Sequence, residues 1–240
     1  MASELAAILG PHLRAQFPDT YVPTSRWYAS GSGMCWRQRW YTARRIPRDE
    51  GTEPDARSVL TMATGSWLHE RLQSAMLAAG GEAVEAEVSW RDELIGLGVR
   101  ADLLVTAPAL GLRPKQVPCI VEIKTVSDFG FRKARNDGPE DRHVMQAMHG
   151  AVMHGSAAGV LIVYLSRDKL ELASWYMPLD DDWRQRIQHD RHRIGELDRL
   201  EKVPHRVIPG VGVVAEPAGR AAPWPCRYCA WRDRCEEDGE

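Results

Sequence analysis

The chain has 240 residues, 44% of them hydrophobic and 27% charged, and its formal net charge is -2. It is long enough to bury one good core, and its composition is that of an ordinary globular protein. No segment approaches the roughly 20 consecutive apolar residues of a membrane span, and no basic-then-apolar leader begins the chain, so we expect a cytoplasmic protein without a membrane partner. The five cysteines are too few and too clustered for a disulfide framework, which fits a reducing compartment.

The N-terminal segment predicts a helix followed by an unusual mixture of aromatic and basic side chains. Leucine and isoleucine recur at helical spacing over residues 3–16, and residues 25–45 interleave tryptophan and tyrosine with arginine. Such rings can stack on unpaired bases while guanidinium groups bind phosphates, which makes Trp36 and Arg37 candidate DNA contacts. The rings can equally just enclose a metal cluster at Cys35, because burying an aromatic side chain requires no ligand.

A long helix is predicted over residues 57–79, and it carries His69 four residues after Gly65. A single histidine on a helix is more often structural than a ligand, unless carboxylates converge on it. The following segments predict strands. Residues 84–90 alternate, residues 94–106 contain a second and a third short strand, and residues 117–126 have a β-branched apolar centre.

Two of these strands carry acidic residues among apolar ones. Asp102 interrupts the segment VRADLLV, and Glu122 and Lys124 share one face of the segment CIVEIKT because strand side chains repeat every two residues. An unpaired carboxylate in a core is very unfavourable, so a bound divalent cation is the natural partner. Carboxylates hold Mg2+ or Mn2+, imidazole favours Mn2+, and such a cation activates water beside a scissile phosphate, where a lysine adds positive charge.

The second half of the chain predicts a loop and further helices and strands. We expect a polar loop after Lys124, in which Arg132, Lys133 and Arg135 either bind a sugar-phosphate strand or are simply solvated. A helix over residues 141–154 carries Gln146, which can orient a substrate or Lys124. A hairpin (159–166 and 170–177), a helix (179–201) and an irregular Pro- and Gly-rich arm (203–225) complete the pattern.

The arm ends in a C-x2-C-x5-C motif, formed by Cys226, Cys229 and Cys235, which with Cys35 offers four thiolate ligands. This arrangement predicts that the two ends of the chain meet at one metal centre. An iron-sulfur cluster and a structural zinc ion both accept such ligands, and the long gap and the x5 spacing favour the cluster. The fifth cysteine, Cys119, is expected to be a buried apolar filler.

Taken together, these motifs resemble the PD-(D/E)XK nuclease superfamily, in its RecB-like branch with an iron-sulfur cluster, which includes the CRISPR-associated Cas-four exonucleases and phage relatives. The resemblance covers residues 25 to 236. It implies an α/β fold with a restriction-endonuclease-like core, in which helices flank a mixed central β-sheet. It further implies an N-terminal helical, cluster-contributing segment (1–56), a nuclease core (57–202) and a C-terminal arm with the cysteine triad (203–240), all in one compact unit.

The resemblance also implies roles for individual residues. Mn2+ or Mg2+ would be bound by His69, Asp102, Glu122 and the main-chain carbonyl of Ile123, while Asp102, Glu122, Lys124 and Gln146 would be catalytic. A 4Fe-4S cluster, with zinc as the alternative, would be bound by Cys35, Cys226, Cys229 and Cys235.

Two positions depart from the family pattern. Ala101 stands where the family has a nominal proline, and Gly150 stands where a tyrosine usually follows the glutamine motif. The adjacent His149 is a speculative replacement for that tyrosine.

We therefore expect a metal-dependent exonuclease acting on single-stranded DNA, with 5'-to-3' polarity implied by the resemblance alone. Phage recombination, DNA repair or CRISPR adaptation would use the same site, with a helicase, recombinase or CRISPR integrase as partner. A catalytically silent iron-sulfur DNA-binding or adaptor subunit of a larger complex is the alternative.

Overall fold

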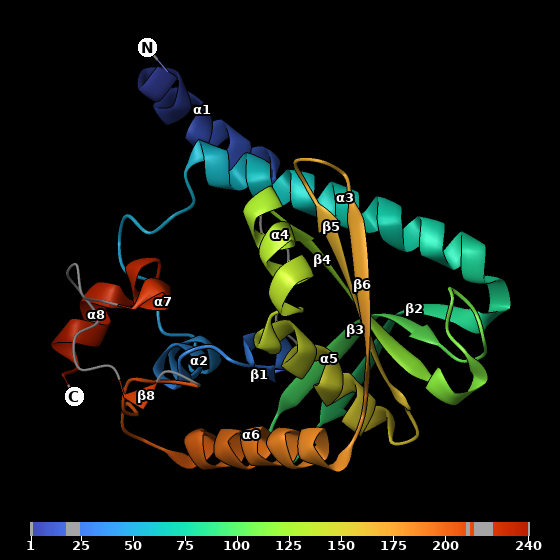
Figure 1. The fold of residues 1–240 in the computed structure, drawn as a ribbon. Coiled ribbons are helices and arrows are strands. Elements are labelled where there is room, and N and C mark those ends of the chain that lie inside the picture. The colour runs from blue at the N-terminus through green and yellow to red at the C-terminus, as the bar shows by residue number, and fades with distance from the viewer. Residues whose placement is uncertain (1, 18–24, 210–211, 214–222, 240) are drawn as a thin grey trace.

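The computed structural model describes residues 2–17, 25–209, 212–213 and 223–239. Its centre is a six-stranded mixed sheet with the order β1-β3-β4-β5-β6, and β2 also pairs with β3 (Figure 1). The strands of this sheet are β1 (Trp27–Tyr28), β2 (Val84–Asp92), β3 (Leu97–Val105), β4 (Cys119–Val126), β5 (Gly159–Ser166) and β6 (Leu172–Pro178). The α-helices are α1 (Ala2–Gln16), α2 (Trp36–Ala43), α3 (Ala56–Gly80), α4 (Asp128–Asp137), α5 (Asp141–His154), α6 (Asp181–Arg199), α7 (Trp224–Arg227) and α8 (Arg232–Glu237).

The longer elements confirm the predictions made from hydrophobic periodicity. The expected helices over 3–16, 57–79, 141–154 and 179–201 correspond to α1, α3, α5 and α6, and the expected hairpin is β5–β6. The α3 helix begins where the side chain of Asp55 accepts a hydrogen bond from the Ser58 amide, which satisfies one of the free N–H groups of its first turn. The predicted mixed α/β fold with helices on a mixed sheet is confirmed.

Two local predictions are wrong. The segment after Lys124 is not a loop, because it forms α4, which Ser127 caps by accepting from the Gly130 amide. Its buried face consists of Phe131 and Ala134 alone, so a short helix of mostly charged residues gave little hydrophobic signal. Residues 94–106 contain one strand, β3, preceded by a turn at 93–96, instead of two short strands.

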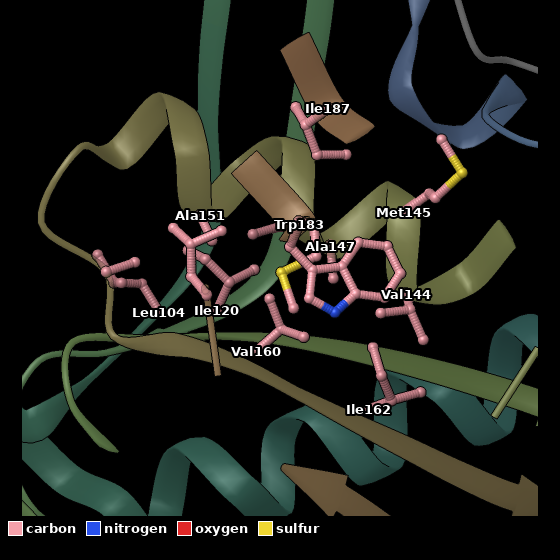
Figure 2. Close-up of a cluster of buried hydrophobic side chains, with 14 of the residues drawn as sticks. Leu104, Ile120, Val144, Met145, Ala147, Ala151, Val160, Ile162, Trp183 and Ile187 are labelled. Atoms are coloured by element: carbon pink, nitrogen blue, oxygen red, sulfur yellow. The ribbon is translucent and has the colours of Figure 1, made fainter. Parts of the chain in front are cut away.

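The helices cover both faces of the sheet. On one face, Leu72, Met76 and Leu77 of α3 pack against a cluster that includes Leu103 and Val121. On the other face, α4, α5 and α6 cover a larger core; Figure 2 shows the indole of Trp183 in its middle. This arrangement makes the two faces of β4 chemically different, because Ile120 faces α5 whereas Val121 faces α3.

The C-terminal helices α7 and α8 lie beside α2, whereas α1 packs along α3 and lies apart from them (Figure 1). The predicted meeting of the two ends therefore holds for the segment around Cys35 and not for the N-terminal helix. The indole of Trp231 donates to the main-chain oxygen of Ile46 at 3.0 Å, and the amide of Asp233 donates to the carboxylate of Asp49 at 2.7 Å. Part of the expected arm is ordered as a small ladder between β7 (Val207–Ile208) and β8 (Gly212–Val213), and residues 210–211 and 214–222 lie outside the described residues.

The aromatic side chains of residues 25–45 build a core of their own. Within the described ranges this core joins residues from α2, β3, α6 and the C-terminal segment, and it includes Trp27, Trp36, Trp40, Tyr41, Leu97, Ile194, Leu197 and Trp231. Several guanidinium groups stack on these rings, with Arg39 over Trp36 at 4.4 Å from the ring centre. The burial of these rings therefore favours the interpretation that they serve packing. No helix in the described ranges has the length and apolar character to cross a bilayer.

A buried ionic triad ties this aromatic core to the main sheet. The carboxylate of Asp190 on α6 lies 3.0 Å from Nη1 of Arg39 on α2 and 3.0 Å from Nε2 of His149 on α5, and all three side chains are buried. Burial opposes ionisation of Asp190, yet His149 and Arg39 lower its pKa to about 2. Each partner therefore depends on the others to remain buried.

We predict that Asp190→Ala destabilises the protein by about 3–5 kcal/mol, because it leaves a guanidinium buried without its counter-ion. The unfolded-state pKa of an aspartate is about 3.9, so the stability that Asp190 contributes is present above about pH 4 and is lost as the pH falls towards 2. Thermal unfolding at several pH values measures both effects. Glu201→Ala, on the exposed surface, is the control, and equal melting temperatures for the two variants would contradict the triad's role.

Candidate active site and cysteine-lined cavity

The candidate active site lies where β3 and β4 separate. The ladder between them joins Leu103–Val105 to Cys119–Val121 and does not continue to Glu122. The side-chain alternation of β3 is also interrupted at Asp102, since Ala101 and Leu104 belong to the core under α5 while Leu103 belongs to the core under α3. Such a local irregularity turns a side chain away from the regular pleat, which here directs Asp102 into the gap between the strands.

Asp102 bridges this gap by a short hydrogen bond. Its Oδ2 accepts from the main-chain amide of Ile123 at 2.6 Å and lies 3.2 Å from Nε2 of His69. The α3 helix holds His69 close to β4, because Gly65 has no side chain and a Cβ there would lie 2.9 Å from Oγ1 of Thr125. The predicted convergence of a carboxylate on His69 is therefore present.

Glu122 and Lys124 lie on the α5 side of β4, where they meet Gln146. Oε1 of Glu122 accepts from Nε2 of Gln146 at 2.7 Å and lies 2.6 Å from Nζ of Lys124, while Lys124 donates to Oε1 of Gln146 at 3.0 Å. The three side chains form a closed triangle of hydrogen bonds, as expected if both strand residues share the face that α5 covers. Gln146 thereby fixes the position of the lysine ammonium group.

Burial and neighbouring charges shift the pKa values of the acidic and imidazole groups of this site. Glu122 is only 2% exposed, and burial raises its pKa to about 7, with the nearby Asp102 carboxylate acting in the same direction and Lys124 opposing it. The hydrogen bond with Asp102 raises the pKa of His69, and Glu122 adds to this effect. His69, Asp102 and Glu122 thus act on one another electrostatically as a cluster of two acids and one imidazole.

The donor types of this cluster suit Mn2+ or Mg2+, although the side chains are not arranged around a common point. Among the described residues, no three His, Cys, Asp or Glu side chains have the geometry of an ion site. The hydrogen-bond triangle explains this for Glu122, since its Oε1 is directed at Lys124 and Gln146. Carboxylate and imidazole ligands nevertheless match the preference of these cations, so the residues fit such a group chemically.

One residue of this region carries no sequence signal for the site. Gln73 on α3 donates to the main-chain oxygen of Asp102 at 2.9 Å and to Oε1 of Glu87 at 2.8 Å, which supports β3 at its irregular point. A glutamine on a helix has no distinctive spacing, and only the packing of α3 on the sheet places it here.

The proposed replacement of the missing tyrosine by His149 is wrong. His149 is fully buried and lies 3.0 Å from the carboxylate of Asp190 on α6, so its ring belongs to that ion pair. A Cβ at Gly150 would lie in van der Waals contact with Ile120 at 3.4 Å and with Trp90 of β2 at 3.6 Å, so apolar side chains surround this position.

The four cysteines of the predicted metal centre line one small cavity with a volume of about 20 Å³. Cys35 comes from the start of α2, Cys226 and Cys229 from α7 and the turn after it, and Cys235 from α8. Burial raises the pKa of Cys35 and Cys226, and it raises that of Cys229 to about 11. Cys119 lies elsewhere, fully buried under α3, which confirms it as an apolar filler.

Arg37 is the unexpected member of this cavity. It is 1% exposed and donates to the main-chain oxygens of Pro204 and Gly239 at 2.7 Å and to Sγ of Cys235 at 3.6 Å. Within the described part of the chain, its hydrogen-bond acceptors include no carboxylate. A buried cation without a counter-ion is unfavourable by several kcal/mol, on the order expected for a desolvated charge.

The burial of Arg37 and of Trp36, which is 7% exposed, also corrects their assignment as DNA contacts, because neither offers a surface to a strand. The other predicted contacts, Arg132, Lys133 and Arg135, are exposed on α4. Arg132 and Arg135 form exposed ion pairs with Asp128 and Glu171, at 3.3 and 3.7 Å. Such pairs contribute little and are readily exchanged for other anions.

The chain matches no protein-family model and no curated protein. Among solved structures, it is similar to SSO0001, with 20% identity and a TM-score of 0.53, over 98% of this chain and 96% of that one. It is also similar to an alkaline exonuclease, LHK-Exo, from Laribacter hongkongensis, with 15% identity over 71% of this chain and 87% of that one and a TM-score of 0.49. The complex of LHK-Exo with dAMP gives a TM-score of 0.50, with 15% identity over 72% of this chain and 87% of that one. At these identities the similarity shows a shared fold.

Proposed function

We propose that this protein is a divalent-cation-dependent DNA exonuclease. The observation that carries the proposal is the convergence of His69, Asp102, Glu122, Lys124 and Gln146 at the separation of β3 and β4. The fold that the chain shares with an alkaline exonuclease supports the same reaction class. The core motifs of the PD-(D/E)XK pattern, with Asp102 followed by Glu122 and Lys124, are all present.

The residues of the site have separable roles in phosphodiester hydrolysis. His69, Asp102, Glu122 and the main-chain oxygen of Ile123 would hold the cation. When bound, a Mn2+ or Mg2+ ion would supply Lewis acidity and a more acidic water molecule. Lys124, positioned by Gln146 at 3.0 Å, places a positive charge beside the reacting phosphate, where negative charge develops in the transition state.

A single strand is the substrate that best fits the burial of the site. Glu122 is 2% exposed, so a phosphate must come close to a recessed carboxylate, which a separated strand does more easily than a duplex. The exposed Arg132, Lys133 and Arg135 of α4 follow β4 directly and would bind the strand through its phosphates. A helicase or recombinase that delivers single strands is a suitable partner.

We predict that the wild-type protein degrades end-labelled single-stranded DNA with Mn2+ and that Asp102→Ala is slower by about 10³-fold. Loss of one ligand removes several kcal/mol of transition-state stabilisation, and each 1.4 kcal/mol is about tenfold in rate. Comparing 5'- and 3'-labelled substrates gives the polarity. The control is Asp137→Ala on the exposed end of α4; equal activity of the Asp102 variant and this control would contradict the assignment.

We also propose that the cysteine-lined cavity holds a 4Fe-4S cluster. Four thiolates and a cluster carry a net negative charge, which would give the buried Arg37 an anionic partner that its described hydrogen-bond acceptors do not include. Zinc would require the four sulfurs about 3.8 Å apart, from Zn–S bonds of about 2.3 Å in a tetrahedron. What supports a four-thiolate centre is that the four cysteines line one cavity together with Arg37.

We predict that Cys229→Ala lowers the melting temperature and the yield of folded protein, because the metal centre would join α2 to the C-terminal segment and its binding would be coupled to folding. Iron and acid-labile sulfide content and visible absorbance of anaerobically purified protein measure the loss. Cys119→Ala removes the cysteine that lies outside the cavity, and this variant should keep the visible absorbance of the wild-type protein. A colourless Cys229 variant with an unchanged melting temperature, or a wild-type protein that binds zinc instead of iron, would contradict the proposal.

A further inference from the structure

Beside the candidate active site, His143 forms a short hydrogen bond with Tyr164. His143 lies on α5 one turn before Gln146, and Tyr164 lies on β5 directly opposite Lys124 in the parallel ladder with β4. Oη of Tyr164 is 2.5 Å from Nδ1 of His143, and the rings meet edge to face with centres 5.6 Å apart. Neither residue belongs to the metal-binding and lysine motifs, yet both border the lysine.

The hydrogen bonds of Tyr164 determine which ring nitrogen of His143 carries the proton. Tyr164 is 1% exposed, and its Oη already accepts from the main-chain amide of Glu140 at 3.0 Å. If Nδ1 also donated to this oxygen, the phenolic hydrogen would be buried without an acceptor among the described residues. The satisfied arrangement has Tyr164 donating to Nδ1, so the proton of a neutral imidazole lies on Nε2.

The surroundings of His143 keep the ring neutral and leave Nε2 available. Burial lowers the pKa of His143 to about 3, and the nearby cations Lys124 and Arg142 act in the same direction. Among the described residues, Nε2 of His143 has no hydrogen-bond partner. It is not among the fully buried polar atoms without a partner, so solvent can reach it. The ring therefore presents an N–H group to solvent near the lysine, and this donor does not change its protonation across the neutral range.

We propose that His143 is a further catalytic residue, which donates its Nε2–H to a phosphate oxygen of the strand bound beside Lys124. This inference rests on the proposed nuclease function. A neutral donor adds to the stabilisation of developing negative charge without repelling the lysine ammonium group, as a second cation would. Tyr164 is then a positioning residue, which selects the tautomer that makes Nε2 the donor.

The kinetic test compares His143→Ala and Tyr164→Phe with wild-type protein on single-stranded DNA with Mn2+. Removing one preorganised donor of this kind lowers kcat by about 10²- to 10³-fold, so we expect that loss in His143→Ala with little change in KM. Added imidazole should restore part of the activity, which a purely structural role would not allow. Tyr164→Phe should lower kcat by about tenfold, the equivalent of one hydrogen bond. His189→Ala, exposed on α6, is the control.

A kcat of His143→Ala within twofold of wild type, or a loss that imidazole does not restore, would overturn the inference. A second measurement is independent of turnover: 15N NMR of the histidine ring nitrogens reports the tautomer, and the Nε2 resonance of His143 should shift when a deoxynucleoside monophosphate is added. If the wild-type protein is inactive but this resonance shifts, the proposed function fails and the phosphate contact stands. If the wild-type protein degrades DNA while the resonance reports the Nδ1–H tautomer, the inference fails and the proposed function stands.

Discussion

The hydrogen bond between the amide of Ile123 and the carboxylate of Asp102 is the interaction on which the candidate site depends. It spans the point where β3 and β4 stop pairing, so the acidic side chain replaces a main-chain acceptor of the ladder. The separation lets Glu122 and Lys124 reach Gln146 on α5, while His69 reaches Asp102 from α3. Helices on both faces of the sheet are therefore required, and α3 and α5 each contribute a side chain to one site.

A second constraint is the burial of charge where α2 meets the C-terminal segment. Arg37 lies beside Cys235 among main-chain oxygens, and Arg39, two residues along, is neutralised by Asp190. Arg39 has a carboxylate partner within the protein, whereas Arg37 would be neutralised by the proposed anionic metal centre. Because Asp190 also contacts His149 on α5, the aromatic core around the cysteines is continuous with the helix that carries Gln146. The cysteine-lined cavity and the candidate active site are then parts of one packed structure.

Much of this was predictable because it depends on periodicity and residue type. The long helices and the strand that carries Glu122 and Lys124 follow from hydrophobic spacing, and the approach of Cys35 to the C-terminal cysteines follows from the cysteine pattern. The short helix α4 was missed because its buried face has only two residues. Arg37 resembled a DNA contact because sequence gives the charge of a side chain and not its burial. The partnership of His143 with Tyr164 required the parallel register of β4 and β5, which local sequence does not encode.

The central claim is that Asp102 and Glu122 share a divalent cation, and anomalous diffraction from crystals soaked in Mn2+ tests it most directly. The account predicts a manganese peak bonded to His69, to both carboxylates and to the main-chain oxygen of Ile123, with Glu122 turned away from its present contact with Lys124. Coordination distances near those of oxygen and nitrogen ligands would identify the ion as bound. A crystal that contains manganese elsewhere, with the Glu122, Lys124 and Gln146 triangle unchanged, would contradict the account.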